Sequence, residues 1–240
     1  MIHSVSHRQD GLWTALRMTG GRIGTGRRDW MVHRGGLGNI MRFSTGLSPV
    51  LASGSSIRRI LLDGVGLRFE VKLPDVDEPA LKRGVEGSSE GLATLLAGAK
   101  AVEVSARAGE RWVIGSDSIA ECDGRRFDKP RDREAAAAHL RSFSGSTLAV
   151  ISAVVLARSG VVEWRYAERA LLKVRALSEG FIESYLDAEW PEVSGCVGVF
   201  RMEGRGATLF EAVEGSHFTV LGLPLLPLLG ALRERGVMGS

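Results

Sequence analysis

PVLASGSSIRR, residues 49–59, is the stretch of sequence that decides the fold we expect for this chain. It begins with a short apolar run, residues 49–52, which predicts a buried strand. Small hydroxyl residues and a glycine follow, and two arginines then open a segment of helical composition. A strand, a tight turn and a helix in this order are typical of an α/β protein.

The turn in this stretch has the chemistry of an anion-binding site. Residues 53–56 (SGSS) can present backbone N–H groups and hydroxyls at a helix N-terminus, where the helix dipole favours an anion. Arg58 and Arg59 would add forked donors for phosphate oxygens. On these residues alone, a capped surface helix with two solvated arginines explains the pattern equally well.

A second polar cluster lies in WVIGSDSIAECDGRRFDKP, residues 112–130. The apolar residues 112–114 predict a buried strand, and we expect this strand to end at residues 115–117, so that Asp117 stands at the start of a turn. A carboxylate at a strand end, beside Lys129, can pair a metal ion or a water activator with a phosphate-binding cation. For a single aspartate, a structural role in a turn is the more frequent interpretation.

The composition is that of a compact soluble protein. The chain has 240 residues, of which 44% are hydrophobic and 25% charged, as in ordinary globular domains. No apolar run approaches the roughly 20 residues that span a bilayer, so we do not expect a membrane partner. The two cysteines, Cys122 and Cys196, form no CxxC motif, which favours a reducing cytoplasm and argues against zinc.

Basic charge is concentrated at the N-terminus. Residues 1–47 contain seven arginines and two aspartates, a formal charge of +5, whereas the remaining 193 residues carry 24 basic and 26 acidic groups. A nucleic-acid-binding tail, a targeting segment or a poorly ordered extension would have this composition. We favour a natural start at Met41. We expect a basic Gly/Arg-rich extension over residues 1–47, one domain over residues 48–240, and no nucleic-acid partner.

The remaining patterns predict a single α/β unit. We expect helices over residues 56–63, 90–107, 131–143, 178–188 and 224–235. We expect strands over residues 49–52, 69–73, 112–114, 119–121, 147–158 and 161–174. Ser159-Gly160 joins the last two strands as a hairpin. The acidic PDVDE, residues 74–78, is expected to be a loop after the second strand.

Six short motifs in order resemble the Maf family of nucleotide pyrophosphatases. They are LASGS..RR (51–59), PDVDE (74–78), IGSD (114–117), DKP (128–130), EGRG..LFE..EG (203–215) and LGLPL (221–225). Several of these are weak alone, but six in the correct order and spacing are specific. The resemblance runs from about Pro49 to about Arg235, and therefore covers nearly everything except the N-terminal extension.

The resemblance implies a single α/β domain with a mixed, twisted sheet and a deep cleft, related to the inosine-triphosphate pyrophosphatases. It implies a cytoplasmic hydrolase of nucleotide metabolism that converts a nucleoside triphosphate to the monophosphate and pyrophosphate. A divalent metal, Mg²⁺ or Mn²⁺, would assist, and a homodimer is possible in this family. A protein of another class also remains open: a non-catalytic nucleotide-binding regulator of septum formation, the process for which the family was first named.

The resemblance also implies roles for individual residues. The substrate-binding residues it implies are Ser53, Ser55, Arg58, Arg59 and Lys100. Asp117 matches the family's proton acceptor, Glu78 its acidic position and Lys129 the lysine of its KP motif, so these three are the expected catalytic residues. Asp117 and Glu78 would hold the metal. Two alternatives stay open: the second arginine of the loop could be a structural neighbour, and Asp75 or Asp77 could replace Glu78.

Three positions divide the family by substrate. Members that act on dTTP and UTP have the arginine pair directly after Ser-Pro, Asp-Thr at the acid and a late Gln-Gly. Here Ile57 precedes the arginines, Ser118 follows the acid and the late pair is Glu203-Gly204, which resembles the branch that hydrolyses 7-methyl-GTP. A carboxylate suits guanine because it accepts from N1–H and the exocyclic amine together. A dTTP or UTP pyrophosphatase is the alternative, since Ile57 replaces an aromatic residue and Ser118 is short for a base contact.

Overall fold

The computed structural model describes residues 46–239 except residues 84 and 86. The expected N-terminal extension over residues 1–47 falls almost entirely outside the described residues. Within them the strands are β1 (Val50–Ala52), β2 (Glu70–Val71), β3 (Val113–Cys122), β4 (Arg125–Phe127), β5 (Thr147–Arg158), β6 (Val161–Val174) and β7 (Phe210–Glu214). The helices are α1 (Ser56–Gly64), α2 (Glu78–Lys82), α3 (Ser89–Ala106), α4 (Arg133–Phe143), α5 (Glu179–Glu189), α6 (His217–Val220) and α7 (Leu225–Glu234), with 3-10 turns η1 (Glu192–Gly195) and η2 (Arg205–Leu209).

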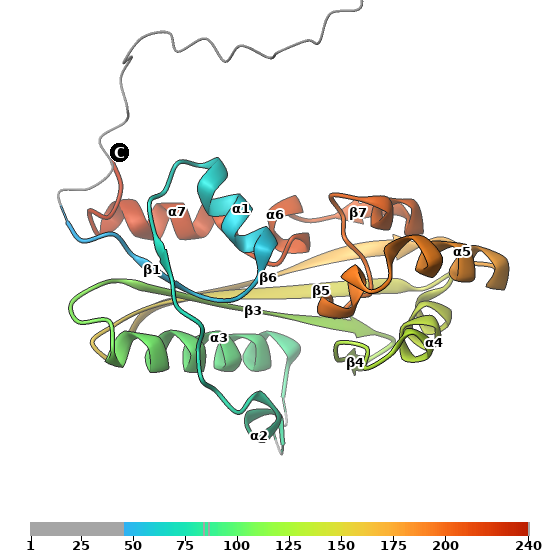
Figure 1. The fold of residues 1–240 in the computed structure, drawn as a ribbon, viewed down its shortest axis with the longest axis horizontal. Coiled ribbons are helices and arrows are strands. Elements are labelled where there is room, and N and C mark those ends of the chain that lie inside the picture. The colour runs from blue at the N-terminus through green and yellow to red at the C-terminus, as the bar shows by residue number, and fades with distance from the viewer. Residues whose placement is uncertain (1–45, 84, 86, 240) are drawn as a thin grey trace, which may run out of the picture. The chain divides into compact units, whose positions relative to one another are not determined.

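One seven-stranded sheet organises the described residues (Figure 1). Its order is β2-β1-β3-β5-β6-β7, and β4 pairs with the far end of β3. β1 is parallel to both of its neighbours, whereas the other pairs are antiparallel. The prediction of a single α/β unit with a mixed sheet is therefore confirmed.

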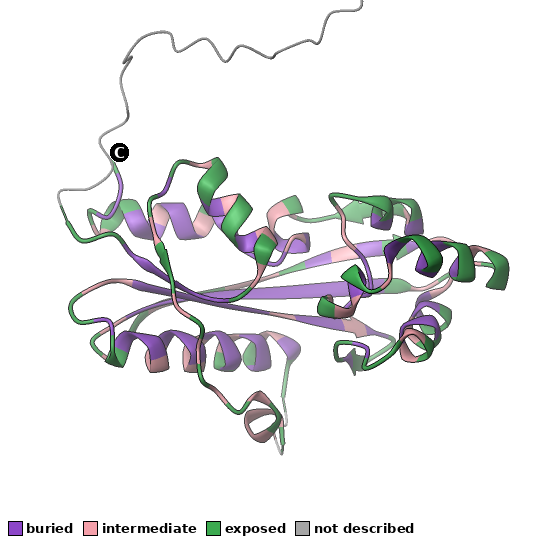
Figure 2. Cartoon of the chain, in the orientation of Figure 1, coloured by how far each residue is buried: buried purple, intermediate pink, exposed green. Residues whose placement is uncertain are grey.

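Helices cover both faces of this sheet. α3 lies on one face, α1, α6 and α7 lie on the other, and α4 and α5 stand at one end of the long strands (Figure 1). Ten consecutive residues of β5 are buried, because this central strand has helices above and below it (Figure 2). Among the described residues, no helix combines the length and apolar character needed to cross a membrane.

Close packing of α3 on β3 fixes the centre of the sheet. A Cβ atom built on Gly115 would lie 2.2 Å from the carbonyl oxygen of Ala97 and 2.8 Å from the Cβ of Ala101. Only glycine allows the strand and the helix to approach this closely. Because Asp117 follows two residues later on β3, and Lys100 belongs to α3, this contact also sets the distance between two candidate site residues.

The predicted end of the strand at residues 115–117 is wrong. β3 continues without interruption from Val113 to Cys122, and Asp117 pairs with Ala153 of β5 in its middle. The polar residues in this stretch fit a central strand because the sheet satisfies them: the hydroxyl of Ser116, for example, donates to the carbonyl of Ala153 at 2.7 Å.

The acidic segment at residues 74–78 also differs from expectation, because it ends in a helix. The side chain of Asp77 accepts a hydrogen bond from the backbone N–H of Ala80 at 2.9 Å and caps α2. Pro79 occupies the first turn, where a proline is tolerated. Glu78 therefore belongs to a short helix and not to a loop.

Candidate functional site

A pocket of about 740 Å³ gathers most of the predicted site residues. Those that line it are Ser53, Ser55, Ile57, Arg58, Glu78, Lys100, Asp117, Ser118, Lys129 and Glu203. Arg59 is exposed and does not line the pocket. The pocket receives residues from the loop before α1, from α2, α3 and β3, and from the segment that follows η1. These segments are far apart in sequence and meet at this one place.

The loop before α1 is organised by its own hydroxyl groups. The side chain of Ser55 caps α1 by accepting from the backbone N–H of Arg58 at 3.4 Å, and the hydroxyl of Ser53 accepts from the backbone N–H of Ser55 at 3.2 Å. The N-terminal end of α1 thus forms one wall of the pocket, with Gly54, Ser55, Ser56 and Ile57 lining it. Its dipole favours an anion at this wall.

The guanidinium of Arg58 is buried and makes four hydrogen bonds to the protein. Nε donates to the carbonyl of Gly222 at 2.8 Å, Nη1 to the hydroxyl of Ser53 at 3.2 Å and the carbonyl of Ser116 at 2.9 Å, and Nη2 to the hydroxyl of Ser118 at 3.1 Å. Arg58 therefore ties the loop before α1 to β3, on either side of Asp117 in sequence, and to the turn before α7.

Lys100 links the two predicted acids. Its Nζ lies 2.5 Å from Oδ1 of Asp117 and 2.8 Å from Oε1 of Glu78. Burial alone would raise the pKa of Glu78, but the hydrogen bond and charge of Lys100, with smaller contributions from two other lysines, hold this pKa below its ordinary value. Burial lowers the pKa of Arg58, against the opposing charges of Asp117 and Glu78. Lys100 and the two carboxylates thus form one ion-paired cluster, and the charge of Arg58 lies near enough to interact with both acids.

The carboxylates of this cluster fit a hard divalent cation. Asp117 and Glu78 supply oxygen donors, and both already face one positive charge, that of Lys100. No group of three or more His, Cys, Asp or Glu side chains that could hold a metal exists among the described residues. Mg²⁺ is commonly bound through only one or two carboxylates, with substrate phosphates and waters as the other ligands. The donor set therefore suits Mg²⁺ or Mn²⁺.

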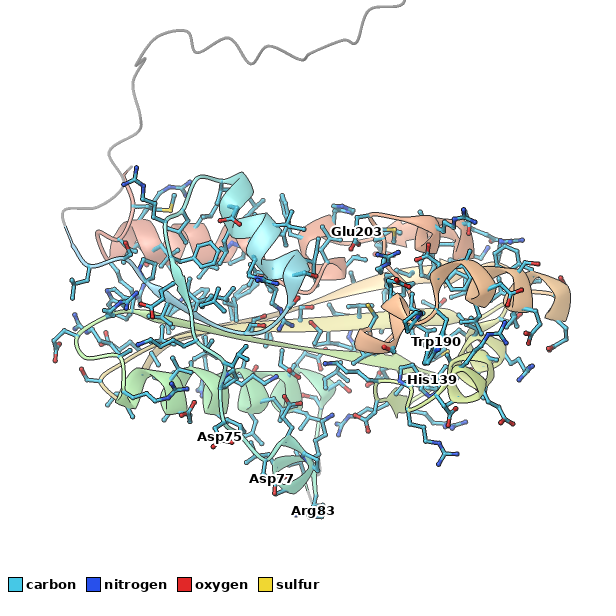
Figure 3. All side chains as sticks on the ribbon, in the orientation of Figure 1. Asp75, Asp77, Arg83, His139, Trp190 and Glu203 are labelled. Carbon is cyan, nitrogen blue, oxygen red and sulfur yellow. The ribbon has the colours of Figure 1, made fainter. Side chains whose placement is uncertain are left out.

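Of the three acids in the 74–78 segment, Glu78 is the one that lines the pocket. Asp75 and Asp77 are exposed, Asp75 near α3 and Asp77 at the start of α2 (Figure 3). The side chain of Asp77 is engaged as the cap of α2.

One ion pair at the pocket was not predicted from the sequence. Lys82 Nζ lies 2.5 Å from Oδ1 of Asp128, and this ion pair joins α2 to the segment after β4. The sequence could have indicated Lys82 only if helix α2 had been predicted, since Lys82 lies one helical turn after Glu78. Lys129, next to Asp128, is exposed and has no ion pair with any described residue.

The other half of the pocket belongs to the segment from η1 to the turn at Glu203. The residues that line this half include Glu192, Cys196, Val197, Phe200, Arg201, Met202 and Glu203. It is richer in apolar side chains than the α1 end and lacks its cluster of hydroxyl groups. Glu203 is exposed at this end, and it lies on the opposite side of the sheet from Asp77 of the α2 cap (Figure 3).

Comparison with known proteins agrees with the predicted resemblance. The Maf family model, described as Maf-like protein, matches residues 49–235. A protein of Nitrobacter hamburgensis named nucleoside triphosphate pyrophosphatase is 46% identical over 191 residues, which cover 79% of this chain and 94% of that protein. A protein of Rhizobium etli named 7-methyl-GTP pyrophosphatase is 44% identical over 192 residues, which cover 79% of this chain and 96% of that protein.

A solved structure gives a weaker match. The crystal structure of a nucleoside-triphosphatase, dITP/XTP pyrophosphatase, from Mycobacterium abscessus is 17% identical with a TM-score of 0.38, and the match covers 79% of this chain and 98% of that one. At this TM-score the likeness adds nothing to the assignment, which rests on the sequence matches. With the family model spanning the pocket and its surrounding sheet, this chain belongs to the Maf family.

Proposed function

We propose that this protein hydrolyses a nucleoside triphosphate to the monophosphate and pyrophosphate, and that 7-methyl-GTP is its preferred substrate. The observation that carries the proposal is the cluster in which Lys100 bridges Asp117 and Glu78 inside a pocket that also receives the N-terminus of α1. Relatives of the same family that are more than 40% identical are named nucleoside triphosphate pyrophosphatase and 7-methyl-GTP pyrophosphatase.

The α1 end of the pocket would bind the triphosphate. Backbone N–H groups and the hydroxyls of Ser53 and Ser55 suit phosphate oxygens, and Lys129 offers a cation that forms no ion pair with any described residue. Arg58 contributes its positive charge and the one N–H group that its four bonds to the protein leave over. The positive charge of Lys100 can attract the same phosphate groups.

Asp117 would orient the attacking water and accept its proton. The oxygen of that water forms a bond with the α-phosphorus, the bond from this phosphorus to the bridging oxygen breaks, and pyrophosphate leaves. The ammonium group of Lys100 contacts the carboxylates of both Asp117 and Glu78 and holds the pKa of Glu78 below its ordinary value. A divalent metal held by these two carboxylates would supply positive charge to the phosphate oxygens.

The η1 end of the pocket would bind the base. Glu203 offers two acceptor oxygens, which match the N1–H and exocyclic amine of guanine. The hydroxyl of Ser118 lies 3.1 Å from Nη2 of Arg58 and 2.9 Å from the hydroxyl of Ser152, so it is engaged by the protein. Among the three positions that divide the family, Glu203 therefore carries the assignment to a guanine nucleotide.

The proposed function is tested by measuring pyrophosphate release in the presence of Mg²⁺ or Mn²⁺. The substrates compared are 7-methyl-GTP, GTP, dTTP, UTP, CTP and ATP. We expect the highest kcat/KM for 7-methyl-GTP. A preference for dTTP or UTP would overturn the substrate and leave the reaction in place, whereas no turnover of any nucleotide would favour a non-catalytic regulator.

The Asp117→Asn variant tests the mechanism. It keeps the shape of the side chain and removes its charge, so turnover should disappear while the folded state persists, as judged by circular dichroism. Asp75→Asn, at an exposed acid outside the pocket, is the matched control and should retain activity. An active Asp117→Asn enzyme would contradict the assigned role.

A further inference from the structure

Behind the base end of the pocket, the buried carboxylate of Glu189 contacts Arg201, a residue that lines the pocket. Glu189, at the end of α5, accepts two hydrogen bonds from Arg201 at its Oε2 atom, one from Nε at 3.1 Å and one from Nη2 at 2.8 Å. The Glu189 side chain is only 4% exposed, whereas the Arg201 side chain is 36% exposed and lines the pocket. A buried charge of this kind is costly unless it is paired, and Arg201 is the partner that pairs it.

Arg201 has other acids within reach of its charge. Hydrogen bonding to Glu189 raises the pKa of Arg201 most, and the charges of Glu189, Glu203 and Glu192 raise it further. Yet neither Glu203 nor Glu192 forms an ion pair with Arg201 or with any other described residue. The guanidinium therefore binds the carboxylate of Glu189 on α5, and the carboxylate of Glu203, two residues along the chain from Arg201, is left without an ion pair.

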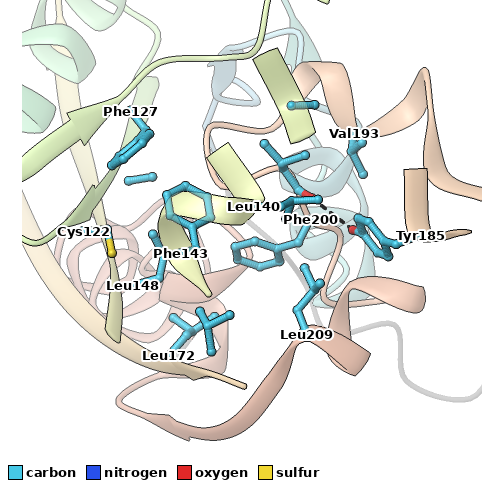
Figure 4. Packing of buried hydrophobic residues seen from close by; sticks show 14 of the residues in the cluster. Cys122, Phe127, Leu140, Phe143, Leu148, Leu172, Tyr185, Val193, Phe200 and Leu209 are labelled. Atoms are coloured by element: carbon cyan, nitrogen blue, oxygen red, sulfur yellow. Dashed lines mark hydrogen bonds between the residues drawn. The ribbon is translucent and has the colours of Figure 1, made fainter. Parts of the chain in front are cut away.

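α5 holds the same segment at a second point. The Tyr185 hydroxyl donates to the carbonyl of Val199 at 3.0 Å (Figure 4). Tyr185 and Glu189 are four residues apart and so lie on one face of the helix. Val199 has a φ of 55°, a left-handed conformation that costs free energy in a β-branched residue and persists only where the surroundings impose it.

The turn that carries Glu203 is equally constrained. A Cβ atom built on Gly206 would lie 2.5 Å from the carbonyl oxygen of Arg201 and 2.6 Å from its backbone nitrogen. The backbone of residues 201–206 is therefore folded tightly on itself. With two anchors to α5 and this closed turn, the position of the Arg201 side chain depends on Glu189.

We propose that Glu189 is a positioning residue for base selection, which takes up the charge of Arg201 and so leaves Glu203 free to accept the N–H groups of guanine. The inference rests on the proposed function, in which Glu203 contacts the base. Without the charge of Glu189, Arg201 turns to the acids nearest to it, and an ion pair with Glu203 occupies the acceptor oxygens that the base needs. Neutralisation of Glu203 also removes its attraction to the positively charged ring of 7-methylguanine.

Glu189→Gln tests the proposal, with the ratio of kcat/KM for 7-methyl-GTP to kcat/KM for UTP as the readout. We expect this ratio to fall roughly tenfold, the size of one lost hydrogen bond to a charged group. Adding Arg201→Met should restore the ratio, because the competing cation is then gone. Glu183→Gln is the matched control: Glu183 lies on the same helix and pairs with Arg133 of α4 outside the pocket, so the ratio should not change.

The rescue separates positioning from a structural role. If Glu189 only stabilised the fold, Arg201→Met would leave the ratio low, and that result would overturn the proposal, as would a wild-type ratio in Glu189→Gln. Should Glu189→Gln alone not fold, the double variant decides, since it must then show the wild-type ratio. Glu203→Gln separates the two proposals. If the ratio is unchanged in Glu203→Gln, Glu203 does not contact the base and the proposed function fails at this residue. If the ratio falls in Glu203→Gln but not in Glu189→Gln, only the positioning role of Glu189 is refuted.

Discussion

Lys100 is the residue on which the charge balance of the pocket depends. Its ammonium group stands within 2.8 Å of both Asp117 and Glu78, and its side chain is only 10% exposed. Without this charge, the carboxylate of Glu78 would lose its main source of compensation and would hold a proton more readily. Lys100→Met preserves most of the side-chain volume and removes the charge together with the N–H donors of the ammonium group.

We expect Lys100→Met to lower kcat for the preferred nucleotide by about 100-fold or more. The pKa of Glu78 is lowered by Lys100, so its loss should raise that pKa and move the acid limb of the pH–rate profile to higher pH. Lys72→Met is the control, since Lys72 pairs loosely with Glu70 at 3.8 Å outside the pocket. A variant at position 100 with near-normal kcat would contradict a role for Lys100 in this cluster.

Arg58 illustrates what the sequence could and could not predict at this scale. The residue was expected beside a phosphate because it follows a hydroxyl-rich loop. Its partners Ser116, Ser118 and Gly222 lie 58, 60 and 164 residues further along the chain, so no local pattern could identify them. The type of residue needed at the site was predictable, whereas the bonds that fix it depend on the tertiary fold.

The contact between α3 and β3 determines how two elements present their site residues. Gly115→Ala would place a Cβ atom against backbone atoms of Ala97 and Ala101, which cannot move without shifting the helix. We expect a loss of about 1–3 kcal/mol in the free energy of unfolding, as for other overpacked positions, and a lower kcat because α3 carries Lys100. Urea denaturation followed by circular dichroism measures the first effect.

Gly98→Ala on the same helix is the matched control. Nothing lies within 4 Å of a Cβ atom at that position, so alanine should be neutral or stabilise the helix by about 0.5–1 kcal/mol. Equal unfolding free energies for the two alanine variants would show that the close approach at Gly115 does not constrain the sheet.

Elements were predictable where apolar residues set a clear period. The hairpin of β5 and β6 has the bounds expected from its β-rich runs, and Ser178, the first residue of the helix expected over residues 178–188, caps α5. The full length of β3 was not predictable, because the Gly-Ser-Asp-Ser run inside this strand has the composition of a turn. It is a strand because β1 and β5 pair with it on either side, and such tertiary pairing overrides local composition.

At the scale of the whole molecule, ion pairs add a second link between elements that already pack together in the hydrophobic core. Glu90 of α3 pairs with Arg169 of β6, and Glu179 of α5 pairs with Arg141 of α4. The hydrogen bonds in these pairs lower the pKa of each glutamate, and a hydrogen bond with Arg111 lowers that of Glu70 on the edge strand β2. The folded protein therefore binds fewer protons at these sites than the unfolded chain does.

The sign of the resulting pH dependence follows from these lowered pKa values. The stabilisation is fully present above the ordinary glutamate pKa of 4.5 and is lost as the pH falls through the lower values of the folded state. We expect the urea midpoint to fall as the pH is lowered from about 5 to about 3. The slope should be smaller in 0.5 M NaCl, because these pairs are exposed and salt screens them. It should also be smaller in Arg141→Met, which removes one pair. A urea midpoint that stays constant or rises on acidification would show that these pairs do not connect the elements energetically.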